Sequence, residues 1–424
     1  MKYYLFLILG LACSRLAYSQ VDTAQKVDAA TRNSAVQQQK PYVIMISIDG
    51  FRYDYAEKHH AVHLKQLGAG GVHAESMIPS YPSLTFPNHY SLVTGLYPAH
   101  HGLVQNYFYD RNFKSLYSYK SKTATEGKWY GGTPIWLLAE RQKMLSASFY
   151  WVGSEADIQG KYPTYYYKYN EQIGIHDRIQ TVVNWLEQPA DRRPHLITFY
   201  FPEVDHQGHK FGPDAQETDK AVHFVDSAIY ELTKAVKATG LKVNYVIVSD
   251  HGMTNIDREH SPVTPAIALD TAKFIKADEG VLMHLYAKNP DDIQSAYAEI
   301  KAQAKDYQVY LRDSLPAKWH YSAKDDWHNR IGDIVLVPNW PKSFNTTHRK
   351  LDPGAHGYDP YTVKDMHAIF YAWGPNFKKR LTIPAFQNVD IYPMIAQLLN
   401  LTYNDKIDGT KELADKVLIK KKKK

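Results

Sequence analysis

The chain has 424 residues, 44% of them hydrophobic, 22% charged and 13% aromatic, which excludes an intrinsically disordered or collagen-like protein. The formal charge of +6 comes from the chain ends: Lys420–Lys424, Lys2 and Arg15 supply seven of the 50 basic residues. The remaining 43 basic residues balance 44 acidic ones, so no specific nucleic-acid partner is expected. A single cysteine, Cys13, excludes a disulfide framework.

Residues 1–19 have the pattern of a signal peptide. The apolar run Tyr3–Ala12 is too short to span a bilayer, and Ala17–Ser19 offers a small-x-small cleavage site. The pattern indicates an exported protein of bacterial type, periplasmic or secreted, with no transmembrane span in the mature chain. Lipid anchoring through Cys13 is the alternative to simple cleavage. The polar residues 20–40 are predicted to be a linker.

Four apolar runs of strand length predict a sheet that is buried on both faces. In chain order, the runs are Tyr42–Ile48, His195–Phe201, Val243–Ser249 and Ala368–Trp373. Helical patterns occur between and after them, over residues 175–187, 218–238 and 389–399. This alternation predicts an α/β fold, with a mostly parallel sheet and helices on both faces.

The interval 255–365 fits this pattern less well and is predicted to be a smaller α+β insert. It combines apolar runs at Val281–Ala287 and Ile334–Val337 with a helical pattern near Asp291–Tyr307. The aromatic stretch Tyr162–Tyr169 is expected to be a loop over the edge of the sheet. The core of the fold is expected to consist of two parts, residues 41–254 before the insert and residues 366–415 after it. Residues 416–424 are expected to form a basic tail.

Three of the predicted strands end in acidic residues, which are Asp49, Asp205 and the pair Asp250-His251. The carboxyl ends of strands line the ligand crevice of an open α/β sheet. A single aspartate there often only caps the next helix, but three of them with nearby histidines favour a site.

Two histidines add nitrogen ligands to these carboxylates. Asp205 and His209 are four residues apart, so one helical turn would place both on one side, with His206 out of phase. His356 is flanked by small residues in Gly354-Ala-His356-Gly357. Mixed carboxylate and imidazole ligands favour zinc, since an all-oxygen set would suit Mg²⁺ or Ca²⁺.

Thr85 is the candidate nucleophile. Pro87 suits the first turn of a helix, which places Thr85 near a helix N-terminus, where an anion is favoured. Helix capping would explain Thr85 alone. Beside metal ligands, however, a hydroxyl can ionise near neutral pH and attack an electrophile.

Together these motifs resemble the nucleotide pyrophosphatase/phosphodiesterase family of the alkaline phosphatase superfamily. The resemblance runs from about Pro41 to Leu399 and implies an alkaline-phosphatase-like fold. The matching segments are Ser47-Ile-Asp49-Gly-Phe-Arg52, Pro82-Ser-Leu-Thr85-Phe-Pro-Asn-His89, Thr94-Gly-Leu-Tyr-Pro-Ala-His-His-Gly102, Asp205-His-Gln-Gly-His209, Ser249-Asp-His-Gly-Met253 and Gly354-Ala-His356-Gly357.

The resemblance implies two Zn²⁺ ions per chain. One would be held by Asp205, His209 and His356, and the other by Asp49, Thr85, Asp250 and His251. It also implies that Thr85 attacks phosphorus and forms a phosphothreonine intermediate. Asn106 matches a family asparagine whose amide contacts a non-bridging oxygen, and a neutral donor suits the lower charge of a diester.

Aromatic residues are candidates for binding the substrate. Phe86 directly follows the nucleophile, and Tyr200 lies near the end of the strand that leads to Asp205. Tyr166 resembles a nucleotide-contacting tyrosine of the family, although its neighbouring tyrosines leave the register open. Aromatic rings can sandwich a nucleobase; packing in the core or in a loop is the alternative for each ring.

The function expected from this resemblance is a zinc-dependent phosphodiesterase or nucleotide pyrophosphatase, a monomer that cuts small nucleotides to nucleoside 5′-monophosphates. An alkaline phosphatase-type phosphomonoesterase is one alternative, but no Lys-x-Arg pair that could bind a dianionic phosphate follows Asn106 in a suitable motif. A phosphodiesterase of choline-phosphate esters is another. A non-catalytic exported metal-binding protein is the alternative from a different class.

Overall fold

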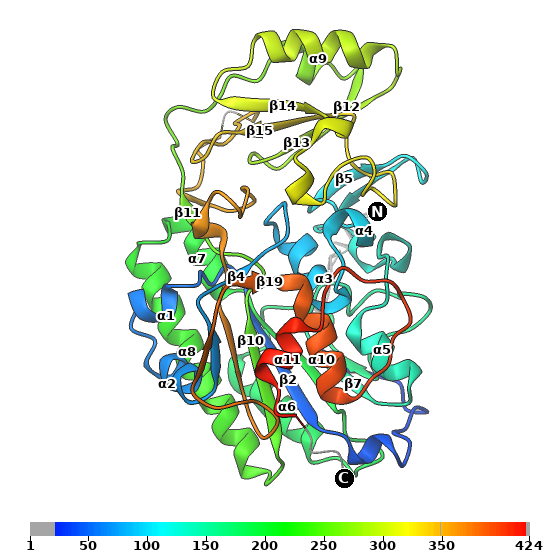
Figure 1. Cartoon of the computed structure of the whole chain (residues 1–424), viewed down its shortest axis with the longest axis vertical. Coiled ribbons are helices and arrows are strands. Elements are labelled where there is room, and N and C mark those ends of the chain that lie inside the picture. Colours follow the sequence, from blue (N-terminus) through cyan, green and yellow to red (C-terminus); the bar gives the residue numbers. More distant parts are fainter. Residues whose placement is uncertain (1–21, 348, 421–424) are drawn as a thin grey trace, which may run out of the picture.

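A nine-stranded mixed sheet forms the centre of the fold, in a computed structural model that describes residues 22–347 and 349–420 (Figure 1). The strand order is β1-β8-β7-β9-β2-β10-β17-β3-β18. The bounds are β1 (Lys26–Val27), β2 (Tyr42–Ile48), β3 (Val72–Ala74), β7 (Ser146–Phe149), β8 (Tyr165–Tyr166), β9 (Leu196–Phe201), β10 (Val243–Val248), β17 (Phe370–Trp373) and β18 (Leu381–Ile383).

The centre of this sheet is parallel, as predicted. Strands β8, β7, β9, β2 and β10 pair in parallel in that order, and β18 pairs in parallel with β3. Strand β17 runs antiparallel to both of its neighbours, and β1 runs antiparallel to β8. The α/β fold class with a mostly parallel sheet is therefore confirmed.

Helices cover both faces of the sheet, which explains the continuous apolar runs. Val43 and Met45 of β2 pack into one core layer, and Ile44, Ile46 and Ile48 pack into the other. The first layer contains residues of α3 (Thr85–Thr94), α4 (Pro98–His101), α5 (Ile135–Arg141), α10 (Ile391–Leu399) and α11 (Glu412–Val417). The second contains residues of α1 (Tyr55–Lys58), α2 (Val62–Gly70), α6 (Ile175–Leu186), α7 (Glu203–Phe211) and α8 (Gln216–Ala238).

The insert is a separate layer with its own small core, located beyond one end of the main sheet (Figure 1). Its four strands are antiparallel, in the order β12-β13-β15-β14. The bounds are β12 (Phe274–Asp278), β13 (Met283–Ala287), α9 (Asp292–Ala302), β14 (Tyr307–Leu311) and β15 (Ile334–Pro338). The chain leaves and returns through a two-stranded ribbon of β11 (Thr254–Asn255) and β16 (Gly354–Ala355).

Two further pairs of short strands lie outside the main sheet. A hairpin of β5 (Tyr107–Asp110) and β6 (Ser115–Ser118) lies against the insert, where β5 contacts β12. Strands β4 (Met77–Ile78) and β19 (Phe386–Gln387) pair in parallel. Within the described ranges 22–347 and 349–420, no helix is long and apolar enough to cross a membrane.

Three segments differ from the sequence expectation. Residues 20–40 contribute β1, and the buried Asn33 side chain donates to Ala190 O and Arg193 O, so the described part of this segment packs on the core instead of forming a free linker. The stretch Tyr162–Tyr169 contains strand β8 instead of forming only a loop. Within the expected tail, Val417 and Leu418 are buried. The signal peptide, Cys13 and Lys421–Lys424 lie outside the described residues.

Candidate active site

Three adjacent parallel strands deliver the acidic residues to one edge of the sheet. Asp49 follows β2 directly, Asp250 follows β10 after one residue, and Asp205 lies in the first turn of α7, which begins after β9. Gly50 makes this convergence possible. It has a φ of +67°, and a Cβ atom there would lie 2.9 Å from the Asp205 Cα atom. Any other residue would push the Asp49 turn away from α7.

The first group of ligand atoms comes from Asp205, His209 and His356. The His209 and His356 Nε2 atoms are 2.9 Å apart, and they lie 3.4 and 3.6 Å from Asp205 Oδ1. The i, i+4 spacing on α7 therefore places Asp205 and His209 together as the sequence indicated. His206, on the same helix, forms an ion pair with Glu171 at 3.7 Å and lies outside this group.

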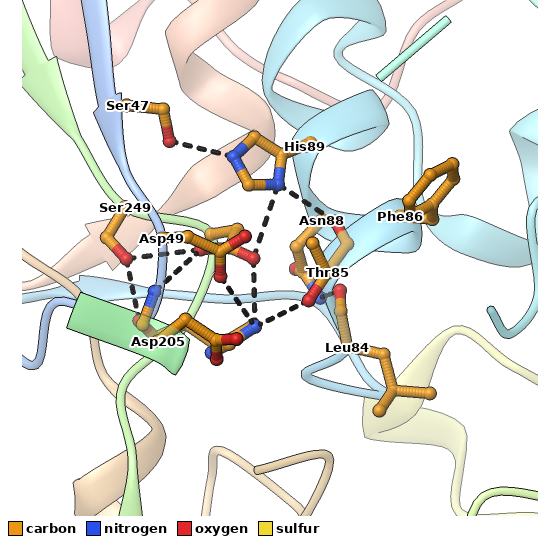
Figure 2. A network of polar contacts seen from close by, with 12 residues as sticks. Ser47, Asp49, Leu84, Thr85, Phe86, Asn88, His89, Asp205 and Ser249 are labelled. Atoms are coloured by element: carbon orange, nitrogen blue, oxygen red, sulfur yellow. Dashed lines mark hydrogen bonds and ion pairs between the residues drawn. The ribbon is translucent and has the colours of Figure 1, made fainter. Parts of the chain in front are cut away.

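The second group is centred on His251. Its Nε2 atom lies 2.9 Å from Asp250 Oδ2, 3.5 Å from Asp49 Oδ1 and 3.1 Å from Thr85 Oγ1. Figure 2 shows Asp49 and Asp205 gathered beside Thr85. The His251 ring also stacks on that of His356 with 3.4 Å between centroids, so the two groups are contiguous.

The three imidazoles share one pattern of hydrogen bonding. Each Nδ1 atom lies 2.9 Å from a backbone carbonyl oxygen, which belongs to Gly354 for His209, Gly252 for His251 and Ser83 for His356. A hydrogen bond from Nδ1–H to a carbonyl fixes the tautomer and leaves the Nε2 lone pair available. All three histidines therefore present a metal-ligand atom to the carboxylates.

The electrostatics of the site suit bound cations. Burial, together with the charges of Asp250 and Asp205, raises the pKa of Asp49 well above its usual range. Burial would also raise the pKa of Asp250, but His251 and His89 beside it hold that pKa well below the usual range. Among the described residues, Asp49 Oδ1, Asp205 Oδ1 and Asp250 Oδ2 are buried without a hydrogen-bond partner. Such orphaned oxygens beside free imidazole nitrogens fit divalent metal.

Thr85 is the first residue of α3 and stands at the mouth of this cluster. The next residue, Phe86, donates its backbone N–H to Asn106 Oδ1 at 3.0 Å. Because that bond uses the carbonyl side of the amide, the Asn106 NH₂ group is the side left to donate to a ligand. Thr85 and Asn106 both line a cavity of about 1000 Å³, together with Asp49, Asp205, His209 and His356.

The candidate aromatic residues are distributed unevenly around this cavity. Phe86 and Tyr200 line it, and the Tyr200 hydroxyl donates to Asp49 Oδ2 at 2.5 Å. Tyr166 is not among the lining residues and stacks on Tyr162 with 5.1 Å between centroids. The neighbours Tyr167 and Tyr169 do line the cavity. Side chains of successive strand residues alternate between the two faces, so a shift of one position in this stretch changes which tyrosine faces the site.

Sequence reasoning missed His89. It lies one turn after Thr85 on α3, with Nδ1 3.0 Å from Thr85 O and 3.2 Å from Asp250 Oδ2. Its Nε2 atom contacts Ser47 Oγ at 2.8 Å (Figure 2). His89 thus ties the nucleophile helix to the β2 and β10 strand ends. The i, i+4 spacing from Thr85 was the available signal.

Comparisons with known proteins show the family of the chain. The family profile described as type I phosphodiesterase/nucleotide pyrophosphatase matches residues 43–359. Ectonucleotide pyrophosphatase/phosphodiesterase family member 1 of Homo sapiens is 34% identical over 384 residues, which are 85% of this chain and 40% of the relative. Venom phosphodiesterase of Macrovipera lebetinus is 34% identical over 403 residues, which are 90% of this chain and 46% of the relative. The chain thus spans less than half of either relative.

Solved structures match over more of their length. Murine ectonucleotide pyrophosphatase/phosphodiesterase 5, as an inactive variant in complex with AMP, superimposes with a TM-score of 0.82 at 29% identity, covering 89% of this chain and 100% of that one. The human protein of the same name gives a TM-score of 0.82 at 28% identity, covering 89% and 99%.

Proposed function

The chain belongs to the type I phosphodiesterase/nucleotide pyrophosphatase family, and we propose that it hydrolyses phosphodiester and phosphoanhydride bonds of nucleotides to nucleoside 5′-monophosphates. One observation carries the proposal: the Thr85 hydroxyl lies 3.1 Å from His251 Nε2, and Thr85 lines a cavity together with members of both candidate ligand groups. A nucleophile placed beside metal ligands is what phosphoryl transfer requires.

The cofactor in this proposal is two Zn²⁺ ions per chain. Asp205, His209 and His356 would hold one of them, and the Asp49, Asp250, His251 and Thr85 side chains the other. The mixed oxygen and nitrogen donors favour zinc over magnesium. Bound zinc would favour ionisation of the Thr85 hydroxyl and offset negative charge on the phosphoryl oxygens.

The chain's own residues then carry out the transfer. The Thr85 oxygen attacks phosphorus as the bond to the leaving oxygen breaks, and the hydroxyl proton passes to solvent or to the leaving oxygen. The product is a phosphothreonine whose phosphorus still carries the nucleoside as an ester. Water then attacks that phosphorus, releases the nucleoside 5′-monophosphate and restores the hydroxyl. The Asn106 amide donates to a non-bridging oxygen throughout. As a neutral group, it suits the single charge of a diester better than the double charge of a monoester.

The substrate in this proposal is a nucleotide whose base lies against aromatic rings. Phe86, one residue after the nucleophile, lines the cavity and is the first candidate for stacking. Tyr200 would act through its bond to Asp49. Tyr167 and Tyr169, which line the cavity where Tyr166 does not, would supply further aromatic contacts. A cavity of about 1000 Å³ is at the upper end for small-molecule sites and is large enough for a nucleotide. The AMP bound to the murine relative supports this assignment, and the relatives' names support an exported location.

The test is hydrolysis by the purified chain of ATP, a dinucleotide and a chromogenic aryl ester of a nucleoside 5′-monophosphate, with the products identified. We expect nucleoside 5′-monophosphate from each, loss of activity with chelator, and better recovery with Zn²⁺ than with Mg²⁺. Phe86→Ala should impair nucleotide cleavage more than cleavage of a small aryl methyl diester. Faster cleavage of a phosphomonoester, or activity that persists in chelator, would contradict the proposal. Preference for choline-phosphate esters would reassign the pocket.

A further inference from the structure

The loop before the nucleophile is bonded directly to the segment that carries His356. Ser83, two residues before Thr85, is fully buried. Its backbone oxygen accepts a hydrogen bond from His356 Nδ1 at 2.9 Å, and its hydroxyl donates to Tyr358 O at 2.8 Å. The same hydroxyl oxygen accepts the Gly357 N–H at 3.1 Å. Ser83 therefore bonds to three successive residues of a segment that lies far from it in the sequence.

The backbone at Gly357 comes very close to this loop. Gly357 has a φ of +109°, and a Cβ atom there would lie 2.9 Å from Leu84 Cδ2. Only glycine allows this approach without strain. Among the described residues, the Ser83 hydroxyl is the only hydrogen-bond partner of the Gly357 N–H and of Tyr358 O. Because buried backbone groups are costly to leave unpaired, this one hydroxyl fixes the two segments against each other.

The place of His356 affects both candidate ligand groups. Its Nε2 atom lies 3.6 Å from Asp205 Oδ1 in the first group, and its ring stacks on that of His251 with 3.4 Å between centroids. His251 Nε2 in turn lies 3.1 Å from the Thr85 hydroxyl. A residue that holds His356 and precedes Thr85 by two positions therefore sets the first ligand group relative to the nucleophile.

We infer that Ser83 is a positioning residue, which holds His356 in the first ligand group at a fixed place relative to Thr85. Its carbonyl oxygen sets the tautomer and direction of the imidazole. Its hydroxyl, which can donate and accept at once, fixes the backbone that follows the imidazole. Ser83 itself touches no reacting atom. The inference rests on the proposed function, in which His356 holds zinc, and adds a residue that supports this ligand.

Ser83→Ala tests the inference, because it removes the hydroxyl and keeps the backbone oxygen. Loss of a residue that supports a metal ligand typically costs about 10- to 100-fold in metal affinity or activity. We therefore expect chelator to remove one of the two zinc ions from Ser83→Ala at about a tenfold lower concentration than from the wild type. The kcat on a nucleotide diester should fall about tenfold or more, with KM changed less than about threefold.

Ser80→Ala is the matched control. Ser80 lies in the same loop, is fully buried and donates its hydroxyl to Asn388 Oδ1 at 2.8 Å. Its backbone N–H donates to Asn88 Oδ1 at 2.7 Å, so both of these bonds lie away from the candidate ligands. Each variant loses one buried hydroxyl, and the two should show similar decreases in Tm. Ser80→Ala should nevertheless keep zinc as the wild type does, with kcat within about twofold.

The variant His209→Ala shows whether Ser83 acts through the first ligand group. That group is already broken in His209→Ala, so adding Ser83→Ala should remove no further zinc and lower kcat by less than about twofold more. Zinc retention in Ser83→Ala equal to that in Ser80→Ala, or losses that multiply in the double variant, would overturn the inference. If Ser83→Ala fails to fold, Ser83→Cys, whose thiol is only a weak donor, takes its place.

The zinc measurement also separates this inference from the proposed function. A wild-type chain that binds two zinc ions but cuts no nucleotide would refute the proposed function. The comparison of zinc retention between Ser83→Ala and Ser80→Ala would still decide the role of Ser83.

Discussion

Thr85 is the proposed nucleophile, and variants at this position test its role in catalysis separately from its role in folding. Thr85→Ala should lower turnover of a nucleotide diester by at least about a thousandfold, because the nucleophile is lost. Thr85→Ser should retain a measurable fraction, since its hydroxyl survives. Steady-state kinetics, zinc content and Tm would be measured for both variants. Turnover near that of the wild type by Thr85→Ala, at full zinc content, would exclude the covalent mechanism.

Individual residues also show what a sequence can reveal about a site. The positions of Asp49, Asp205 and Asp250 could be predicted because each follows a strand with a continuous apolar pattern. The hydrogen bond from the Tyr200 hydroxyl to Asp49 could not be predicted. It joins residues far apart in the chain, and a tyrosine near the end of a strand has many ordinary roles.

At the scale of single elements, helix α7 offers a matched pair of histidines. His209 faces the ligand cluster, whereas His206 is about half exposed and pairs with Glu171. His209→Ala should therefore reduce bound zinc from two ions to one per chain. Activity should fall at least about tenfold, because even the loss of a residue that supports a metal ligand typically costs about 10- to 100-fold. His206→Ala should keep both ions and activity within about twofold. Metal analysis and kinetics on the two variants provide the check. Equal losses of zinc and activity in both variants would contradict the prediction that only His209 faces the ligand atoms.

Element length explains which strands could be predicted. Strand β2 matches its predicted bounds, and β9 and β10 differ from theirs by one residue. Six or seven mostly apolar residues buried on both faces leave a clear pattern. Strands β1 and β8 have two residues each, which is too short for any periodicity. Their pairing depends on the neighbouring sheet edge, and that is a tertiary effect.

At the scale of the whole molecule, the site joins elements that lie far apart in the sequence. Asp49, Asp205 and Asp250 come from three strand ends, and His356 comes from the chain as it returns from the insert. The raised pKa of Asp49 reflects burial and the charges of the other two carboxylates. Bound cations would offset that repulsion, so metal should stabilise the entire fold and not only the site.

We therefore expect chelation to lower Tm and Zn²⁺ to restore it. A ligand at 100 times its Kd stabilises the native state by about 2.7 kcal/mol, which for a chain of this size corresponds to several degrees. Thermal unfolding of the wild type, measured with chelator and after zinc is added back, gives the shift. His209→Ala should show a smaller shift because one ligand group is broken, whereas His206→Ala should show the full one. A Tm that does not respond to chelator, in a protein that contains zinc beforehand, would mean that the ligand cluster is stable without its ions.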